Sequence, residues 1–469
     1  MGFDKAFLPD GFLDRMRDIL GSGFDGFLAS YEKPLRGALR VNTLKAAPGL
    51  TGRYFSAEDK VPWAENGYYY DEDLRPGKSP LHEAGAYYIQ EPSAMLVAAL
   101  SGAAPGERIL DLCAAPGGKS TALAAALEGR GLLVANEIMA PRAKVLSQNI
   151  ERMGIRNAIV TNEPPAALAE RFPEFFDRIV VDAPCSGEGM MRKEPEAIAC
   201  WSMDNISMCA ARQRDILDEA LRMLRPGGVL VYSTCTFAPE EDEAQVIDLL
   251  SRYSELEIAR RSDIEKALRG RADLSAVSGP LDCFAGELGP DAAVFRIWPH
   301  LADGEGHFAA VMIKAGEKLP AGEDAYPFLR KSPRVAAPLL AAWNAFAAEN
   351  LTSLPGGTFT AFGDNLYLSP AALDLSGLRC LRPGLHLGTL QKDRFVPSHA
   401  LALAMRPSDA KRRAELSEDD ALSFISGAEL GCAPELKSWC LVSVCGFTLG
   451  WAKASGGRLK NHYPKGLRK

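Results

Sequence analysis

Apolar runs alternate with amphipathic stretches through the middle of the chain, from about residue 81 to residue 316. The short apolar runs predict strands, and the stretches with a helical period predict helices. The predicted strands span residues 108–113, 132–137, 158–162, 176–184 and 229–235, and the predicted helices span residues 120–127, 141–154 and 215–228. The α/β unit closes near residue 316. Strands that alternate with helices of about 10–15 residues indicate an α/β fold built on a parallel, doubly wound sheet.

The flanking regions have weaker patterns. Amphipathic helices and a strand within residues 36–45 precede a stretch rich in Gly, Pro, Tyr and Asp, and residues 88–102 predict a helix. Residues 315–335 predict a linker, residues 336–406 mix helix and strand signals, and residues 407–420 predict a solvated helix or second linker. Short β runs follow. We therefore expect four domains, at residues 1–80, 81–316, 317–410 and 411–469.

Composition narrows the class of protein. The 469 residues are 47% hydrophobic, which excludes intrinsic disorder, and no apolar run approaches the roughly 20 residues that span a bilayer. The N-terminus lacks the basic start and apolar core of a signal peptide. The ten cysteines include no CxxC pair and the six histidines are scattered, so we expect reduced thiols, a cytoplasmic location and no metal site. A monomer is the default expectation.

The first chemically unusual segment is DLCAAPGGKS, residues 111–120, which joins a predicted strand to a helix. Its glycines and the helix N-terminus suit a ligand, because ligands bind outside the carboxyl ends of strands in such sheets. A phosphate-binding P-loop needs a glycine where Cys113 stands. A nucleoside cofactor such as S-adenosylmethionine fits better, because Glu137 ends the next strand and can accept hydrogen bonds from a ribose.

Two further segments each place a cysteine just past an apolar strand. Cys185 lies in DAPCSGEGM, residues 182–190, and Cys235 lies in STCTFAPEEDE, residues 233–243. A single cysteine in such a place is more often a buried structural thiol. Two of them at neighbouring strand ends, beside a cofactor turn, indicate chemistry instead. The other eight cysteines, including Cys113, are interpreted as structural.

A methyl donor beside thiols suggests methylation of a pyrimidine at carbon 5. That carbon is a poor nucleophile until a thiolate adds to carbon 6 and makes it enamine-like. A carboxyl group can stabilise the adduct by hydrogen-bonding the ring, and Asp182 stands three residues before Cys185. A second base must then help the carbon 5 proton and the thiol to leave. Two cysteines and an aspartate supply these parts.

Together these segments resemble the Nop2/Sun family of RNA cytosine-5 methyltransferases. DLCAAPGGKS resembles the family's cofactor loop, DAPCSGEGMMRK its proline–cysteine motif and STCT its threonine–cysteine motif, and RGALRVNTLK, YYIQEPSAM and RIWPHLADGEGHFAA are also similar to family segments. The resemblance covers residues 30–316. It implies a Rossmann-like S-adenosylmethionine-dependent methyltransferase domain preceded by a small α/β RNA-binding domain.

The tail resembles the RsmF-type bacterial branch, which methylates small-subunit (16S) ribosomal RNA. The similar segments are GLHLGTLQKDRFVPSHALA and LGWAKASGGRLKNHYPKGLRK, which imply an α+β module and a PUA-like β module. From residue 436 onward there are seven Lys or Arg and no Asp or Glu, with Trp439, Trp451 and Tyr463 interleaved. Basic residues bind phosphates and aromatic rings stack on bases, so we expect RNA as partner despite the net charge of −7. A solvated basic tail is the alternative.

The resemblance also implies roles for single residues. Cys235 corresponds to the nucleophile, Cys185 to the residue that assists product release, Asp182 to the acid that meets the cytosine, and Lys119 to a lysine near the substrate. The implied cofactor residues are Cys113, Ala114, Ala115, Pro116, Gly117, Gly118, Lys119, Glu137, Asp182 and, more weakly, Arg142. The family usually has an Asp near Pro164 that contacts the adenine amino group. Here the backbone, Asn162 or Glu163 makes that contact, or the contact is missing.

We therefore predict an enzyme that forms 5-methylcytosine in 16S rRNA through a cysteine adduct. Exchanged roles of the two thiols are one alternative, with Cys185 attacking as in DNA cytosine-5 methyltransferases. Transfer RNA as the substrate is a second alternative. A catalytically inactive RNA-binding assembly factor is a third, which the intact cysteine pair disfavours. The sequence identifies neither the target cytosine nor whether naked rRNA or the assembled subunit is recognised.

Overall fold

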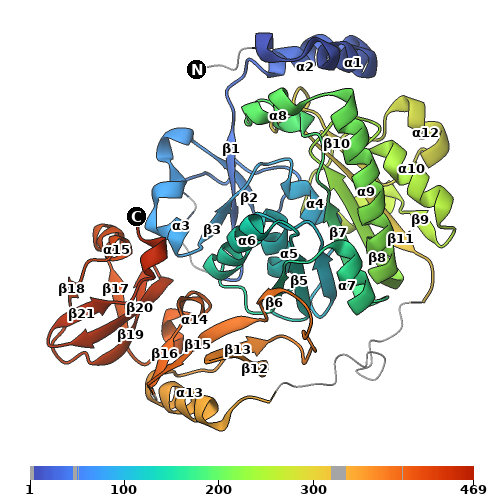
Figure 1. Ribbon diagram of the computed structural model, residues 1–469. Coiled ribbons are helices and arrows are strands. Elements are labelled where there is room, and N and C mark those ends of the chain that lie inside the picture. Colours follow the sequence, from blue (N-terminus) through green and yellow to red (C-terminus); the bar gives the residue numbers. More distant parts are fainter. Residues whose placement is uncertain (1–4, 46–49, 51, 318–333, 393) are drawn as a thin grey trace.

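A nine-stranded sheet forms the centre of the molecule (Figure 1). The computed structural model describes residues 5–45, 50, 52–317, 334–392 and 394–469. Along the main path of the sheet the order is β10-β11-β8-β7-β4-β5-β6-β14, and β9 pairs with β11. Its strands are β4 (Arg108–Asp111), β5 (Leu132–Asn136), β6 (Ala158–Thr161), β7 (Phe176–Asp182), β8 (Leu224–Thr234), β9 (Leu256–Ile258), β10 (Val294–Ile297), β11 (His307–Lys314) and β14 (Cys380–Arg382).

The five central strands, β4 to β8, are parallel, as their apolar sequences predict, because both faces of the sheet are buried. The strand that closes the unit, β11, runs antiparallel to β8, so the sheet is mixed rather than wholly parallel. The order of the strands reverses beside β4, whose carboxyl end therefore opens toward both β5 and β7. This is the place where ligands bind in sheets of this kind.

Helices cover both faces of the sheet (Figure 1). The helices α4 (Met95–Leu100), α5 (Gly118–Ala126) and α6 (Ala140–Arg152) share one apolar cluster with alternate strand residues. The helices α7 (Pro165–Arg171), α9 (Met203–Met223) and α10 (Glu243–Arg252) share the other. Three further helices in this domain are α8 (Pro195–Cys200), α11 (Arg261–Leu268) and α12 (Asp282–Leu288).

Local sequence explains where these helices begin and end. The side chain of Ser202 caps α9 by accepting a hydrogen bond from the backbone N–H of Asn205. The predicted helix at residues 215–228 ends earlier, at Met223, and residues 224–228 instead start β8. Pro226 and the two glycines that follow it disfavour a helix there.

The N-terminal module consists of α1 (Asp10–Leu20), α2 (Phe24–Ser30), α3 (Pro80–Glu83) and a small antiparallel sheet. In that sheet β1 (Gly37–Val41) lies between β2 (Gly67–Tyr70) and β3 (Tyr87–Ile89). The prediction of one helix over residues 88–102 was therefore wrong in its first half, where Pro92 separates β3 from α4. The predicted loop residues 46–49 and 51 lie outside the described residues.

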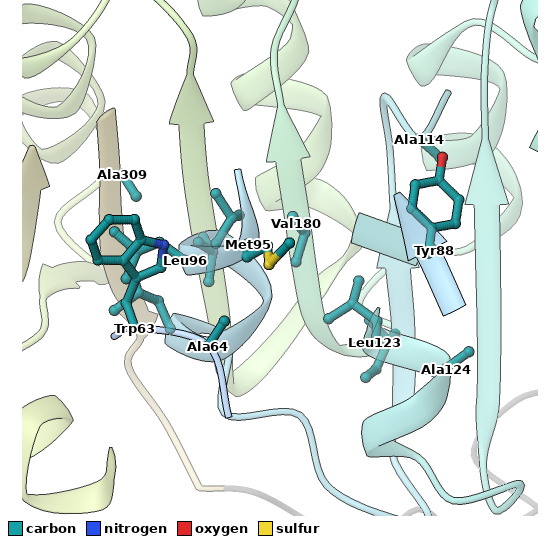
Figure 2. Packing of buried hydrophobic residues seen from close by; sticks show 14 of the residues in the cluster. Trp63, Ala64, Tyr88, Met95, Leu96, Ala114, Leu123, Ala124, Val180 and Ala309 are labelled. Atoms are coloured by element: carbon teal, nitrogen blue, oxygen red, sulfur yellow. The ribbon is translucent and has the colours of Figure 1, made fainter. Parts of the chain in front are cut away.

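The N-terminal module is packed onto the central sheet rather than tethered beside it. Trp63, Met95, Leu96 and Val180 belong to one buried cluster (Figure 2). The indole N–H of Trp63 donates to the carbonyl of Pro92 at 2.7 Å. The N-terminal module and the central sheet therefore share one continuous core. Burial of each large apolar side chain in it contributes roughly 1.5–3 kcal/mol to stability.

Two C-terminal modules complete the chain. The first contains α13 (Ala337–Asn350), β12 (Thr358–Phe362), β13 (Asn365–Ser369), β15 (Leu385–Gln391), β16 (Arg394–Pro397) and α14 (His399–Leu403), and confirms the predicted α+β module. It also supplies β14 to the central sheet. Most of the predicted linker, residues 318–333, lies outside the described residues.

The second C-terminal module is a five-stranded sheet with one helix. Its elements are β17 (Arg413–Leu416), α15 (Glu418–Ser426), β18 (Leu430–Gly431), β19 (Ser438–Val444), β20 (Phe447–Ser455) and β21 (Arg458–Asn461). The prediction of a solvated helix or linker at residues 407–420 was wrong for residues 413–416, which pair with β19. Charged and apolar residues alternate in β17, which turns Ala414 and Leu416 toward the core.

A buried ion cluster anchors the segment that follows β8. Arg296 of β10 is 1% exposed and binds the carboxylates of Asp242 and Glu243 at the start of α10. Asp242 in turn accepts a hydrogen bond from Thr234, the last residue of β8. The cluster therefore fixes both ends of the turn that contains Cys235.

Replacing Arg296 by Met should lower the free energy of unfolding by about 3–5 kcal/mol, because the buried Glu243 carboxylate loses its cation. Thermal unfolding should show a midpoint lower by roughly 10 °C. Arg260→Met is the matched control, since its ion pair with Asp263 is exposed and should contribute about 0.5 kcal/mol or less. Equal midpoints for the two variants would show that the cluster does not stabilise the fold.

Candidate active site

The two predicted cysteines meet because β7 and β8 are neighbouring parallel strands. Their register pairs Asp182 with Ser233, and the chain continues past this edge to Cys185 and Cys235. The two sulfur atoms lie 3.3 Å apart. All ten cysteines are free thiols, and Cys185 and Cys235 are the pair in contact at the carboxyl end of the sheet.

The two sulfur atoms are close enough for a hydrogen bond in which either thiol can donate. The hydrogen bond with Cys235, together with burial, raises the pKa of the Cys185 thiol well above its usual range. The protonated form of Cys185 is therefore favoured. Which thiol attacks and which assists stays a prediction.

An ion pair lies beside the thiols. The ammonium group of Lys119, in the first turn of α5, is 2.7 Å from the Asp182 carboxylate. Burial raises the pKa of that carboxyl, but Lys119 and His307 outweigh burial and hold the pKa below its usual range. Burial lowers the pKa of Lys119, while Asp182 and Cys235 raise it above its usual value. Both groups are therefore charged near neutral pH.

Two residues that the sequence did not single out lie against the Asp182 carboxylate. The hydroxyl of Ser233 donates to Asp182 at 2.9 Å. His307 of β11 is 4% exposed, and its Nε2 lies 3.5 Å from the same carboxylate. Burial and the nearby Lys119 lower the pKa of His307, which keeps its ring neutral. Ser233 begins the quoted STCT motif, but His307 carries no local signal because β11 comes 125 positions after Asp182.

Two buried polar residues clamp the loop that carries Cys185. Glu241 accepts hydrogen bonds from the backbone N–H of Ser186 at 3.0 Å and from Gln213 at 2.8 Å, and Gln213 also donates to the carbonyl of Pro184 at 3.1 Å. Both residues on either side of Cys185 are thus held in place. Burial raises the pKa of Glu241 to about 7.

A second carboxylate ties the two cysteine loops together. Glu188 is 1% exposed and accepts hydrogen bonds from Trp201, from the hydroxyl of Thr236 and from the backbone N–H of Phe237. Glu188 and Glu241 both lie within the two cysteine motifs, so their place in those motifs was the signal that sequence reasoning did not use.

A cavity of about 1090 Å³ opens at the carboxyl ends of β4, β5, β7 and β8. Of the predicted site residues, it is lined by Cys113, Ala115, Glu137, Arg142, Asp182, Cys185 and Cys235. It therefore brings five of the ten predicted cofactor residues and both thiols to one space. The volume is large for a single small-molecule site, which is typically about 300–1,000 Å³, and leaves room for a cofactor and a base.

The remaining predicted cofactor residues lie outside the lining of the cavity. Ala114, Pro116, Gly117, Gly118 and Lys119 are not among the lining residues. Gly117 adopts a φ of +114°, and a side chain there would press on Leu146 of α6. The glycine at 117 is thus required by its backbone conformation and by close packing of α6. Contact of these five residues with a cofactor remains a prediction.

The donor set and shape of the cavity suit a nucleoside. Glu137 directly follows β5. One oxygen of its side chain accepts a hydrogen bond from the backbone N–H of Met139 at 2.9 Å, and the other lies 3.7 Å from Arg142. Arg142 also donates to the carbonyl of Ala115 at 2.9 Å. Ile138 and Met139 are each 55% exposed at the cavity, an apolar surface against which a purine ring can pack.

Neither Asn162 nor Glu163 directs its side chain to the cavity. The Asn162 amide donates to the carbonyls of Glu137 and Ile138, and the Glu163 carboxylate binds Arg379. The two side chains that could have replaced the missing Asp at Pro164 are therefore already engaged. Pro164 itself lines the cavity.

The tail differs from the predicted stacking surface. Trp451 and Tyr463 are each 2% exposed and belong to the cores of the C-terminal modules. Trp439 is half-buried, with Lys453 over its ring at 5.9 Å. The prediction that all three aromatic residues interleave with the basic residues at the surface was therefore wrong for two of them. The rings of Trp451 and Tyr463 are buried in apolar clusters instead.

The described residues contain neither a membrane-spanning helix nor a group of side chains arranged as a metal site. No helix among them is long and apolar enough to cross a bilayer. No group of three or more His, Cys, Asp or Glu side chains within the described ranges is arranged to hold a metal ion.

Four family descriptions match consecutive parts of the chain. Residues 8–92 match the N-terminal domain of 16S rRNA methyltransferase RsmF, residues 98–313 match 16S rRNA methyltransferase RsmB/F, residues 345–405 match the first C-terminal domain of RsmF, and residues 411–469 match the methyltransferase RsmF PUA domain. Together these matches run through nearly the whole chain in one order.

Similar proteins carry the same name. Ribosomal RNA small subunit methyltransferase F of Klebsiella pneumoniae is 36% identical, covering 100% of this chain and 98% of the relative. The protein of that name from Serratia proteamaculans is 34% identical, covering 98% and 97%. Among solved structures, a methyltransferase homolog protein from Pyrococcus horikoshii is 29% identical over 66% of this chain and 100% of its own, with a TM-score of 0.54. NSun6 from the same organism, solved with SFG, shares the fold at 20% identity and a TM-score of 0.54, covering 66% and 99%.

The contact between the two thiols leads to a testable prediction about the reactivity of Cys185. Cys235→Ala removes the hydrogen bond that most raises the pKa of Cys185, so that pKa should fall and the thiolate fraction at a given pH should rise. A fall of one pKa unit means about tenfold faster alkylation of Cys185 by iodoacetamide at pH 8, measured by mass spectrometry. Cys209→Ala, which alters a thiol on α9, should leave the Cys185 rate unchanged. An unchanged rate in Cys235→Ala would mean that the two sulfurs do not share a proton.

Proposed function

Because the chain belongs to the ribosomal RNA small subunit methyltransferase F family, whose members are S-adenosylmethionine-dependent rRNA methyltransferases, we propose that it forms 5-methylcytosine in 16S rRNA. The observation that carries this proposal is the pair of thiols 3.3 Å apart beside the Lys119–Asp182 ion pair. Methylation of oxygen or nitrogen needs no such pair, whereas methylation at carbon 5 needs a nucleophile and an assisting base.

In the proposed mechanism, S-adenosylmethionine supplies an electrophilic methyl group. The Cys235 sulfur adds to carbon 6 of the cytosine, and carbon 5 then takes up the methyl group. The carbon 5 proton leaves with the assistance of Cys185, and the bond between Cys235 and carbon 6 breaks. Clamping of the Cys185 loop by Glu241 and Gln213 keeps this residue next to the adduct.

Asp182 and Lys119 fit a cytosine substrate. The Asp182 side chain is ionised, so it accepts hydrogen bonds and matches the amino group of cytosine better than the carbonyl of uracil. The adjacent ammonium of Lys119 can offset negative charge on the ring as the thiolate adds. Because carbons 5 and 6 must be reached from the ring face, we expect the target base to be unstacked and moved into the cavity.

The cofactor residues of the proposal are those that line the cavity. We assign the ribose to Glu137 and the adenine to the space between Ile138, Met139 and Pro164. Backbone of the segment from Cys113 to Lys119 would pass beside the rest of the cofactor, and Arg142 would hold Glu137 in place. A ribosomal RNA substrate also implies that the protein acts in the cytoplasm.

The order of the two thiols is tested by trapping the adduct. Cys185→Ala should accumulate a covalent enzyme–RNA complex, because the Cys235 thiol still adds to the cytosine but release of the methylated RNA is impaired. Cys235→Ala should form none. Denaturing gel electrophoresis with labelled RNA reads both results, and Cys209→Ala is the control for loss of a thiol elsewhere. The opposite pattern would assign the nucleophile to Cys185, as the first alternative requires.

The substrate is tested by methyl transfer from radiolabelled S-adenosylmethionine to naked 16S rRNA, intact small subunits and bulk tRNA in separate reactions. We expect label in cytosine of one or both ribosomal substrates, since the family match includes the C-terminal modules. Label found only in tRNA would keep the chemistry and overturn the ribosomal assignment. Cofactor binding without label in any RNA would support the assembly-factor alternative.

A further inference from the structure

A segment of the first C-terminal module lies on the methyltransferase domain close to the cofactor cavity. This strap, residues 371–382, ends in β14, which pairs antiparallel with β6 so that Cys380 faces Thr161. Leu373 of the strap is 5% exposed and belongs to the apolar cluster on one face of the central sheet. Ala371, Leu375, Leu378 and Cys380 pack against the same cluster. The strap is therefore part of the domain that it covers.

The polar contacts of the strap converge on two residues after β6. The carbonyl of Arg379 accepts from the backbone N–H of Asn162 at 2.9 Å. The backbone N–H of Arg379 and its guanidinium group both bind the carboxylate of Glu163, the latter at 3.2 Å. Glu163 is 6% exposed, so its charge depends on these donors. Arg379 is mostly exposed and is held here by this contact.

The same two residues form the back of the cavity wall. The Asn162 amide donates to the carbonyls of Glu137 at 2.6 Å and Ile138 at 2.8 Å. The backbone of Glu163 exchanges two hydrogen bonds with the side chain of Asn136, at 2.9 and 3.0 Å. Asn136, Glu137 and Ile138 all line the cavity. One layer of hydrogen bonds thus separates the strap from the surface that we assign to adenosine.

We propose that Glu163 and Arg379 are positioning residues for the cofactor, through which the first C-terminal module holds the adenosine wall in its binding shape. Pro164 lines the cavity, and its side chain has no hydrogen-bonding group. Recognition at this wall then depends on how firmly its backbone is held, and a preorganised wall binds more tightly because less order is lost on binding. This inference rests on the proposed function only in taking S-adenosylmethionine as the ligand.

Isothermal titration of S-adenosylmethionine into the full-length protein tests the inference. Arg379→Met should raise the Kd about five- to tenfold, which is within the usual range for the loss of one hydrogen bond. Glu163→Ala should raise it at least as much, and Glu163→Gln, which keeps an acceptor for the Arg379 N–H, should be less affected than Glu163→Ala. The double variant should bind no more weakly than Glu163→Ala alone, because the two residues act as one unit.

Arg156→Met is the matched control. Arg156 also joins the first C-terminal module to the methyltransferase domain, by donating to the carbonyl of Ala404, but it lies away from the strap and the cavity. Its variant should bind S-adenosylmethionine like the wild type. In turnover assays the strap variants should raise the KM for the cofactor while kcat and the KM for RNA stay unchanged, a split that general loss of structure would not produce.

The outcomes separate this inference from the proposed function. Wild-type affinity in Arg379→Met and Glu163→Ala would overturn the inference while leaving the enzyme assignment intact. Equal weakening by Arg156→Met would show that module docking in general, rather than the Glu163–Arg379 contact, shapes the wall, and would overturn it too. No binding by the wild-type protein would overturn the proposed function and the inference with it.

Discussion

The parallel register of β7 against β8 is the constraint on which the site depends. It sets Asp182 opposite Ser233, which brings the carboxylate to its hydroxyl partner and the two following loops to a sulfur–sulfur contact. A slip of one residue would turn alternate side chains to the other face of the sheet and separate all of these groups. Because both faces of these strands are buried in the two main apolar clusters, the core itself holds the register.

Around this constraint, three other parts of the chain support the site. From the N-terminal module, Arg40 donates to the carbonyl of Gly118 and to the hydroxyl of Thr121, and so holds the first turn of α5, which carries Lys119. From the far end of the methyltransferase domain, β10 and β11 provide Arg296 and His307. The C-terminal strap reaches the opposite wall of the cavity. Within the site, the contact between Lys119 and Asp182 keeps both groups charged although they are buried.

The sequence predicted the elements that carry their own local signal. The strand–helix alternation predicted the central strands, and the unusual segments after them predicted Cys185, Cys235 and Asp182 as neighbours. Partners contributed by remote strands, such as His307 and Arg379, escaped prediction because their contacts arise only when the sheet assembles. Trp451 and Tyr463 could be interpreted as surface or core from sequence alone, since an aromatic ring suits both places, and the fold buried them.

The pairing of β14 with β6 has a further consequence for the handling of this protein. Without β14, the last parallel strand would present a row of unpaired backbone N–H and C=O groups, which can template pairing with another chain. Removal of Leu373 would also open an apolar gap beside that edge. A fragment cut after β11 would therefore be prone to self-association. By covering this edge, the first C-terminal module protects the preceding domain from aggregation.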